Sequence, residues 1–287
     1  ALQAKDPTLP LDELALDHVR LGRALAQLDR LEEAAQLATT AHELLERSEV
    51  GRTPRRVGIL NSIGTVFWIV GDPARAEAIL REAFEISVET MGDDHLRTQV
   101  LRNDLALAAH DQGRLDEAVQ VLETAVAKMA VRFGPEHFAR NLMRINLAEM
   151  LVAAERPAEA LSLLEVLGRE APPESLDILL QDLLLVRGAA ELALGDAAAA
   201  RRDFERGMAL RSARVPEGTS PVAEAESWLG AALVAEGRVE EGRRQLDASF
   251  HRLVAALGPG HPKTRAAGER LARWGGELGE AHALAEA

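Results

Sequence analysis

The chain has 287 residues, a formal net charge of −13 and no cysteine. Without cysteine there are no disulfides, thiol nucleophiles or cysteine-ligated metal centres, and the acidic balance argues against a nucleic-acid-binding surface. Aromatic residues make up only 3% of the chain, which favours helices over β-sandwiches and barrels. No apolar run reaches the length of about 18 residues that a membrane helix needs, and no signal-peptide pattern opens the chain. We therefore expect a cytoplasmic protein with no membrane partner.

Residues 1–10, which contain Pro7 and Pro10, are predicted to be a loose lead-in. A repeat array is predicted to follow over residues 11–275, and a C-terminal tail over residues 276–287. Because the chain begins at Ala1 and not at a methionine, we expect it to be a piece of a longer protein.

Small residues recur along the array at intervals of 40 or 42 residues, and a second small residue follows each of them twelve positions later. A turn signal lies between the two, with apolar residues at helical spacing on both sides. The pattern predicts a pair of antiparallel helices in each unit, crossing closely at the small residues. The small residues are Gly22, Gly64, Ala106, Ala148, Gly188 and Gly230, then Ala34, Ala76, Ala118, Ala160, Ala200 and Gly242. The predicted units are 11–50, 51–92, 93–134, 135–174, 175–217 and 218–260.

The turn between the two helices carries signals of its own. In the second unit, Gly71 is predicted to end the first helix, and Asp72 to cap the second helix, which Pro73 opens. Asp116 is predicted to cap the corresponding helix of the third unit. The first and fourth units lack the glycine and have Leu28-Asp29-Arg30 and Glu155-Arg156-Pro157 instead.

The residues Ile63-Gly64, Phe67, Gly71, Ala76 and Leu80 follow the order of the short tetratricopeptide repeat signature. The chain therefore resembles this family, and its last linker, Leu257 to Thr264, is similar to the linkers of kinesin-light-chain repeats. The resemblance implies an all-α fold: a right-handed α-solenoid, or superhelix, of about six helix-turn-helix units. A capping helix with Leu271 and Trp274 is predicted at about 263–275.

The sequence offers no clear catalytic or metal-binding pattern. His95, His137 and His261 recur in the linkers at least one unit apart, which argues against a shared metal ion and favours caps on the following helices. Lys263-Thr264 lacks the preceding strand of a phosphate loop. The acid pairs Glu32-Glu33 and Glu240-Glu241 open second helices, where they favour the helix dipole. We predict no catalytic residue, no metal site and no cofactor.

The remaining candidate site is a binding groove, because in the family that the chain resembles the first helices line a concave face. Asparagine is a poor helix former, and its amide can pair with the backbone of an extended peptide. Equally, these asparagines could satisfy linker carbonyls or neighbouring helices, and Trp68 could be a packing residue. Arg102 and Arg144 would favour an acidic group on the ligand. The candidate groove residues are Asn61, Thr65, Trp68, Arg102, Asn103, Leu107, His110, Arg144, Asn146 and Glu149.

The predicted function is therefore a non-catalytic scaffold that binds a protein or an extended peptide. The resemblance implies the interaction or sensor region of a larger bacterial regulatory protein, behind a kinase, nucleotide-binding or protease-like domain. The alternatives are a receptor for a small peptide that switches by closure, an all-helical enzyme, and a self-associating module such as a homodimer.

Overall fold

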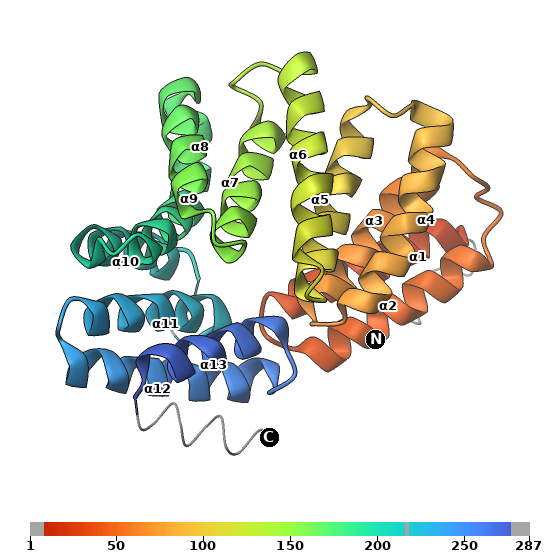
Figure 1. Cartoon of the computed structure of the whole chain (residues 1–287). Coiled ribbons are helices and arrows are strands. Elements are labelled where there is room, and N and C mark those ends of the chain that lie inside the picture. Colours follow the sequence, from red (N-terminus) through yellow and green to blue (C-terminus); the bar gives the residue numbers. More distant parts are fainter. Residues whose placement is uncertain (1–8, 216–217, 277–287) are drawn as a thin grey trace. The chain divides into compact units, whose positions relative to one another are not determined.

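The computed structural model describes residues 9–215 and 218–276. Most of the predicted lead-in and nearly all of the predicted tail lie outside these residues. Within them the chain forms thirteen α-helices and no β-strand, and 81% of it is helical (Figure 1). The predicted all-α repeat fold is confirmed.

The helices belong to two compact units, with the boundary between Gln112 and Gly113. Unit 1 holds α1 (Leu11–Ala26), α2 (Leu31–Glu46), α3 (Pro54–Ile69), α4 (Pro73–Met91) and α5 (Leu96–Asp111). Unit 2 holds α6 (Leu115–Arg132), α7 (Phe138–Ala153), α8 (Pro157–Glu170), α9 (Pro173–Ala193), α10 (Ala197–Ser212), α11 (Ser220–Ala235), α12 (Val239–Leu257) and α13 (Pro262–Trp274). Odd-numbered helices are the first helices of the predicted pairs, and α13 coincides with the predicted capping helix.

Within each unit, the two helices of a pair cross where the small residues lie. Ala76 is fully buried opposite Gly64, and a Cβ added to Gly64 would lie 2.7 Å from Cγ of Leu80. Between α11 and α12 the approach is closer still, because a Cβ on Gly242 would lie 2.5 Å from the carbonyl oxygen of Gly230. Side chains this small let the helix axes approach closely, so the residues of both helices interlock into a continuous core.

The turns that end the first helices confirm the prediction for glycine. Gly71 adopts φ +83°, and the next residue, Asp72, donates its backbone N–H to the carbonyl of Phe67 at 2.9 Å. This left-handed residue with a returning hydrogen bond is the usual glycine stop of a helix. Asp29 and Glu155 take the same conformation, with φ of 57° and 58°, in the two units that lack the glycine.

The capping predictions are confirmed in part. The Asp72 side chain accepts a hydrogen bond from the Arg75 backbone N–H at 3.0 Å. The linker histidines His95 and His261 accept from the backbone N–H two residues later, at 3.2 Å in both cases, whereas His137 makes no such bond. The prediction for Asp116 is wrong: α6 begins at Leu115, so this carboxylate lies inside the first turn and acts on the helix dipole only.

Replacing Glu155 with glycine is expected to stabilise the protein. A non-glycine residue in the left-handed conformation costs about 1–2 kcal/mol, and the gain is reduced because glycine makes the unfolded chain more flexible. We expect the free energy of unfolding to rise by about 0.5–1 kcal/mol in urea titrations. Gly113→Ala, at a residue with φ +80°, is the converse control and should lower it. A lower stability for Glu155→Gly would contradict this account of the turn.

Candidate functional site

Neighbouring first helices lie against each other in both units. In unit 1, α3 contacts α1 and α5, and in unit 2 the contacts run from α7 to α9, from α9 to α11 and from α11 to α13. We call the surface formed by the sides of these helices within one unit the first-helix face of that unit. The residues that the sequence marks as a candidate groove lie on α3, α5 and α7.

Three polar contacts join α3 to α5 in unit 1. Arg97 Nη1 reaches the Pro54 carbonyl oxygen at 3.5 Å, the Asn61 amide donates to Asp104 Oδ2 at 2.8 Å, and Trp68 Nε1 donates to Asp111 Oδ2 at 2.7 Å. Successive contacts are two helical turns apart along both helices. Each contact joins a residue to the one 43 positions later, which is the repeat length plus one.

Asp104 lies at the centre of this row. It also accepts a hydrogen bond from the Asn103 amide at 3.0 Å. Burial raises the pKa of Asp104, while the hydrogen bonds from Asn103 and Asn61 and the positive charge of Arg23 lower it, and the net result is a raised pKa. Both asparagines therefore donate to the Asp104 carboxyl, and Asn61 does so across to the neighbouring helix, whereas Asn103 does so within α5.

The other predicted groove residues of unit 1 are placed as follows. Thr65 is half-buried, and its hydroxyl donates to the carbonyl of Asn61 on its own helix at 2.9 Å. His110 Nδ1 lies 3.1 Å from Asp111 Oδ1, and Leu107 is half-buried on the same helix. Asn103 is only 5% exposed, so it contributes through Asp104 and not through its own surface.

Arg102 and Arg144 are engaged by acidic residues of the chain itself. Arg102 pairs with Asp93 of the preceding linker, and its guanidinium lies 5.0 Å from the ring centre of Phe84. Arg144 is buried, with Nη1 3.0 Å from Glu170 at the end of α8. On the same helix as Arg144, Asn146 is half-buried and Glu149 is exposed.

Unit 2 holds a charged cluster that the sequence analysis missed. Glu224 on α11 lies 2.9 Å from Lys263 Nζ on α13 and 3.6 Å from Arg211 Nη1 on α10. Burial alone would raise the pKa of Glu224, but the positive charges of Lys263 and Arg211 outweigh it and lower the pKa to about 2. This carboxylate is therefore ionised at neutral pH and joins three helices.

Arg270 stands beside this cluster on α13. Its Nε donates to Ser227 Oγ at 3.0 Å, again 43 residues apart, and its guanidinium lies 4.2 Å from the ring centre of Trp228. Burial lowers the pKa of Arg270 to about 10, and carboxylates that include Glu224 and Glu149 offset this only in part. Glu149 lies on α7, three first helices away from α13, yet its charge acts on Arg270 and Lys263.

On α9 and α11 the apolar residues in the middle of the helices belong largely to the core. Leu185, Ala189 and Leu192 are each no more than 8% exposed, and Ala231 is fully buried. They join a hydrophobic cluster that also contains Phe204 and Leu271 of α13.

A hollow of about 560 Å³ opens in unit 1 between α1, α3 and the residues around the start of α5. Gly58 lines it without a side chain, and a Cβ there would lie 2.8 Å from Arg97 Nη1. Its lining combines apolar side chains with basic ones: Leu16, Pro54, Arg55, Gly58, Ile59, Met91, His95 and Arg97.

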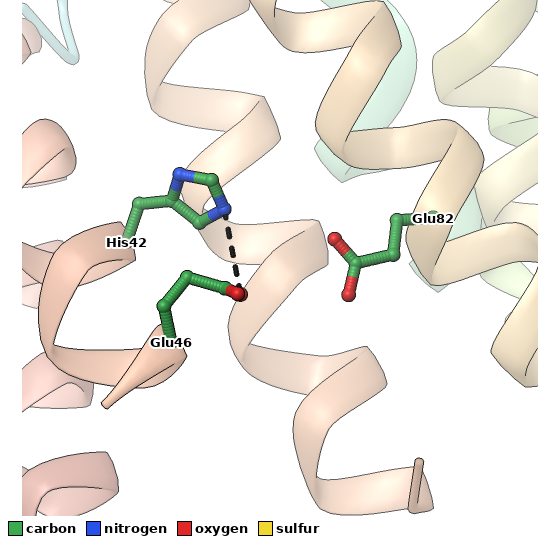
Figure 2. Close-up of side chains that lie close together, drawn as sticks. All are labelled: His42, Glu46 and Glu82. Atoms are coloured by element: carbon green, nitrogen blue, oxygen red, sulfur yellow. Dashed lines mark ion pairs between the residues drawn. The ribbon is translucent and has the colours of Figure 1, made fainter. Parts of the chain in front are cut away.

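His42, Glu46 and Glu82 place three potential metal ligands within 4.8 Å of one another (Figure 2). His42 and Glu46 lie one turn apart on α2, and Glu82 faces them from α4, so sequence spacing alone could not find the group. However, Arg56 already forms ion pairs with both glutamates, and its side chain is 12% exposed. Burial lowers the pKa of Arg56, but Glu82 and Glu46 together leave it raised. A protonated guanidinium therefore neutralises these carboxylates.

These features define the class of the protein: an all-α repeat solenoid made of helical hairpins whose first helices form a polar face. The family model of the tetratricopeptide repeat matches residues 12–89, 55–130 and 97–166, which together span just over half of the chain. The chain belongs to the tetratricopeptide repeat family. No curated protein matches it in sequence. Among the described residues, no helix is both long enough and apolar enough to cross a membrane.

Several solved structures are similar to this chain. NprR, in complex with its cognate peptide NprX, is 14% identical, with 98% of this chain and 79% of NprR covered at a TM-score of 0.67. Aspartyl phosphate phosphatase F from Bacillus subtilis is 13% identical, with 93% and 67% covered and the same TM-score. TPR-like repeats of a proposed kinesin light chain from Podosopora anserina are 18% identical, with 86% and 98% covered at 0.49. At these identities the first two similarities establish the fold.

The pH dependence of stability tests the cluster of unit 2. Folding lowers the pKa of Glu224. The contribution of its carboxylate to the free energy of unfolding is therefore fully present above pH 4.5 and is lost as the pH falls towards 2. We expect Glu224→Gln to cost about 2 kcal/mol at pH 7, since it leaves Lys263 without its partner, and much less at pH 3. Chemical denaturation across this pH range measures the difference.

Glu226, two residues away on α11, is the matched control. It pairs with Arg252, but burial leaves its pKa raised. Its contribution to the free energy of unfolding should therefore fall as the pH rises. The effect of Glu226→Gln on stability should change with pH in the opposite direction to that of Glu224→Gln. The same trend for both variants would mean that the charges around Glu224 are wrongly assigned.

Proposed function

We propose that this chain is a non-catalytic module that binds an extended peptide, or an extended segment of a partner protein, on its first-helix face. The observation that carries the proposal is the arrangement of that face. Adjacent first helices present polar groups in register, at a separation of about 8–10 Å. An extended peptide advances about 3.3 Å per residue, so every third residue would meet a new helix.

The exposed groups on this face suit a peptide. The hydroxyl of Thr65, the amide of Asn146 and the carboxylate of Glu149 are accessible in part or in full. The hollow beside Gly58 offers room for a side chain, with Arg55 and Arg97 at its rim. Each polar contact would contribute only about 0.5–1.5 kcal/mol, so several must act together. The complex of NprR with its cognate peptide supports peptide binding by a chain with the same kind of fold.

We propose further that the module serves a larger bacterial regulatory protein in the cytoplasm. Relatives in fold such as aspartyl phosphate phosphatase F of Bacillus subtilis make a bacterial setting reasonable. An enzyme is the weaker alternative, because in the described part of unit 2 Glu224 is paired with Lys263 and Arg211 with Asp182, which leaves these groups engaged and not poised as an acid–base couple. Self-association has one feature in its favour, the exposed apolar side chains of Val131 and Phe138 in unit 2.

A peptide library tests the proposal. The full chain is immobilised and presented with a phage-displayed library of random peptides, and the selected peptides are synthesised and titrated against the protein in solution. We expect Thr65→Arg to weaken their binding at least tenfold, because the longer side chain covers the first-helix face of unit 1.

Thr90→Arg is the matched control for this substitution. Thr90 lies on α4 of the same hairpin, and its hydroxyl donates to the carbonyl of Ile86 as that of Thr65 does to Asn61. It is exposed on a second helix, so its substitution should leave binding unchanged. Failure to select any peptide, or equal effects of both variants, would contradict the proposal, and a concentration-dependent mass in ultracentrifugation would then favour self-association.

A further inference from the structure

Arg270 is held differently from Arg187 and Arg211 of unit 2. Arg187 pairs with Asp203 through Nε and Nη2, and Arg211 pairs with Asp182 through Nη2. Arg270 uses only Nε, which donates to Ser227 Oγ at 3.0 Å. Its terminal atoms Nη1 and Nη2 form no hydrogen bond or ion pair with any residue in the described part of the chain.

Aromatic side chains fix the plane of this guanidinium. The guanidinium lies 4.2 Å from the ring centre of Trp228, and that ring is stacked on Phe204 at 5.8 Å. Phe204 is fully buried, so the stack is anchored in the core. With one face covered and Nε occupied, the edge formed by Nη1 and Nη2 stays open. Two parallel N–H donors on a rigid plane match the two oxygens of a carboxylate.

The surrounding charges leave this cation incompletely compensated. Glu224 is the carboxylate whose charge acts most strongly on Arg270, but Lys263 Nζ already lies 2.9 Å from it and Arg211 Nη1 3.6 Å. Glu149 and Glu269 act on Arg270 only through space, and the balance still leaves its pKa lowered by burial. A desolvated cation of this kind gains more from an anionic partner than an exposed one does.

We propose that the free edge of Arg270, on the stack of Trp228 and Phe204, binds a carboxylate of the peptide ligand. The inference rests on the proposed function, because it gives the first-helix face of unit 2 a chemical preference. The carboxylate can come from an aspartate or glutamate side chain or from the C-terminus of the peptide. Arg102 and Arg144, which the sequence suggested for this role, are already paired with Asp93 and Glu170.

The test uses synthetic peptides selected by the full chain from the random library. Each peptide is made with a free and with an amidated C-terminus, and with each acidic residue replaced by its amide. Affinities are measured for the wild type and for Arg270→Gln, Arg270→Lys and Arg265→Gln. Arg265 is an exposed arginine on the same helix and serves as the control.

We expect one carboxylate per peptide whose neutralisation weakens binding to the wild type by about ten- to a hundredfold, the range for a charge-assisted pair. Arg270→Gln should lower the affinity for the original peptide by the same factor and leave the affinity for the neutralised peptide unchanged. Arg270→Lys keeps the charge but not the two-donor edge. Its affinity for the original peptide should therefore lie between that of the wild type and that of Arg270→Gln. The peptides with an amidated C-terminus and those with replaced acidic side chains show whether the carboxylate belongs to the C-terminus or to a side chain.

The neutralised peptide also separates a lost contact from a damaged fold, since misfolding would weaken both peptides. Two outcomes would overturn the inference but leave the proposed function standing. In the first, the peptides bind the wild type equally well after every carboxylate is neutralised. In the second, Arg270→Gln weakens the binding of the original and the neutralised peptide by the same factor. Failure of the wild type to select any peptide would overturn both proposals.

Discussion

The close crossing of the two helices of a hairpin, within each unit, is the constraint on which the rest of this structure depends. At Gly242 the carbonyl of the opposite glycine is so near that even one methyl group would not fit. Ala34, Ala76, Ala160 and Ala200 meet the same need in other hairpins, and all are fully buried. Because the crossing fixes how each hairpin is built, the repeat length then determines which residues of neighbouring first helices meet.

The same contact carries different chemistry in the two units. In unit 1 the Asn61 amide meets the carboxylate of Asp104, and in unit 2 the Ser227 hydroxyl meets the guanidinium of Arg270, each pair 43 residues apart. Asp104 and Arg270 occupy equivalent positions of their repeats. The backbone thus supplies one geometry, and the side chain at this position decides whether the first-helix face presents an acid or a base.

Much of the fold could be predicted from the sequence because its signals are local. Glycine at a left-handed turn and alanine at a crossing follow from their lack of a bulky side chain, which identity alone reveals. The left-handed Asp29 and Glu155 carry no such signal, and Asp116 lies two residues beyond the residue that caps α6, Arg114. The pairing of Arg144 with Glu170, and the influence of Glu149 on Arg270, could not be predicted, since they depend on how separate helices approach.

Photo-crosslinking tests the central claim, that ligands lie on the first-helix face, most directly. A benzophenone side chain would be placed at Leu107, half-buried on the first helix α5, and separately at Val131, which is 91% exposed on the second helix α6. With a peptide selected by the full chain, the account predicts a crosslinked product from position 107 and none from position 131. Crosslinking from position 131 alone would contradict it, because the ligand would then lie against the second helices.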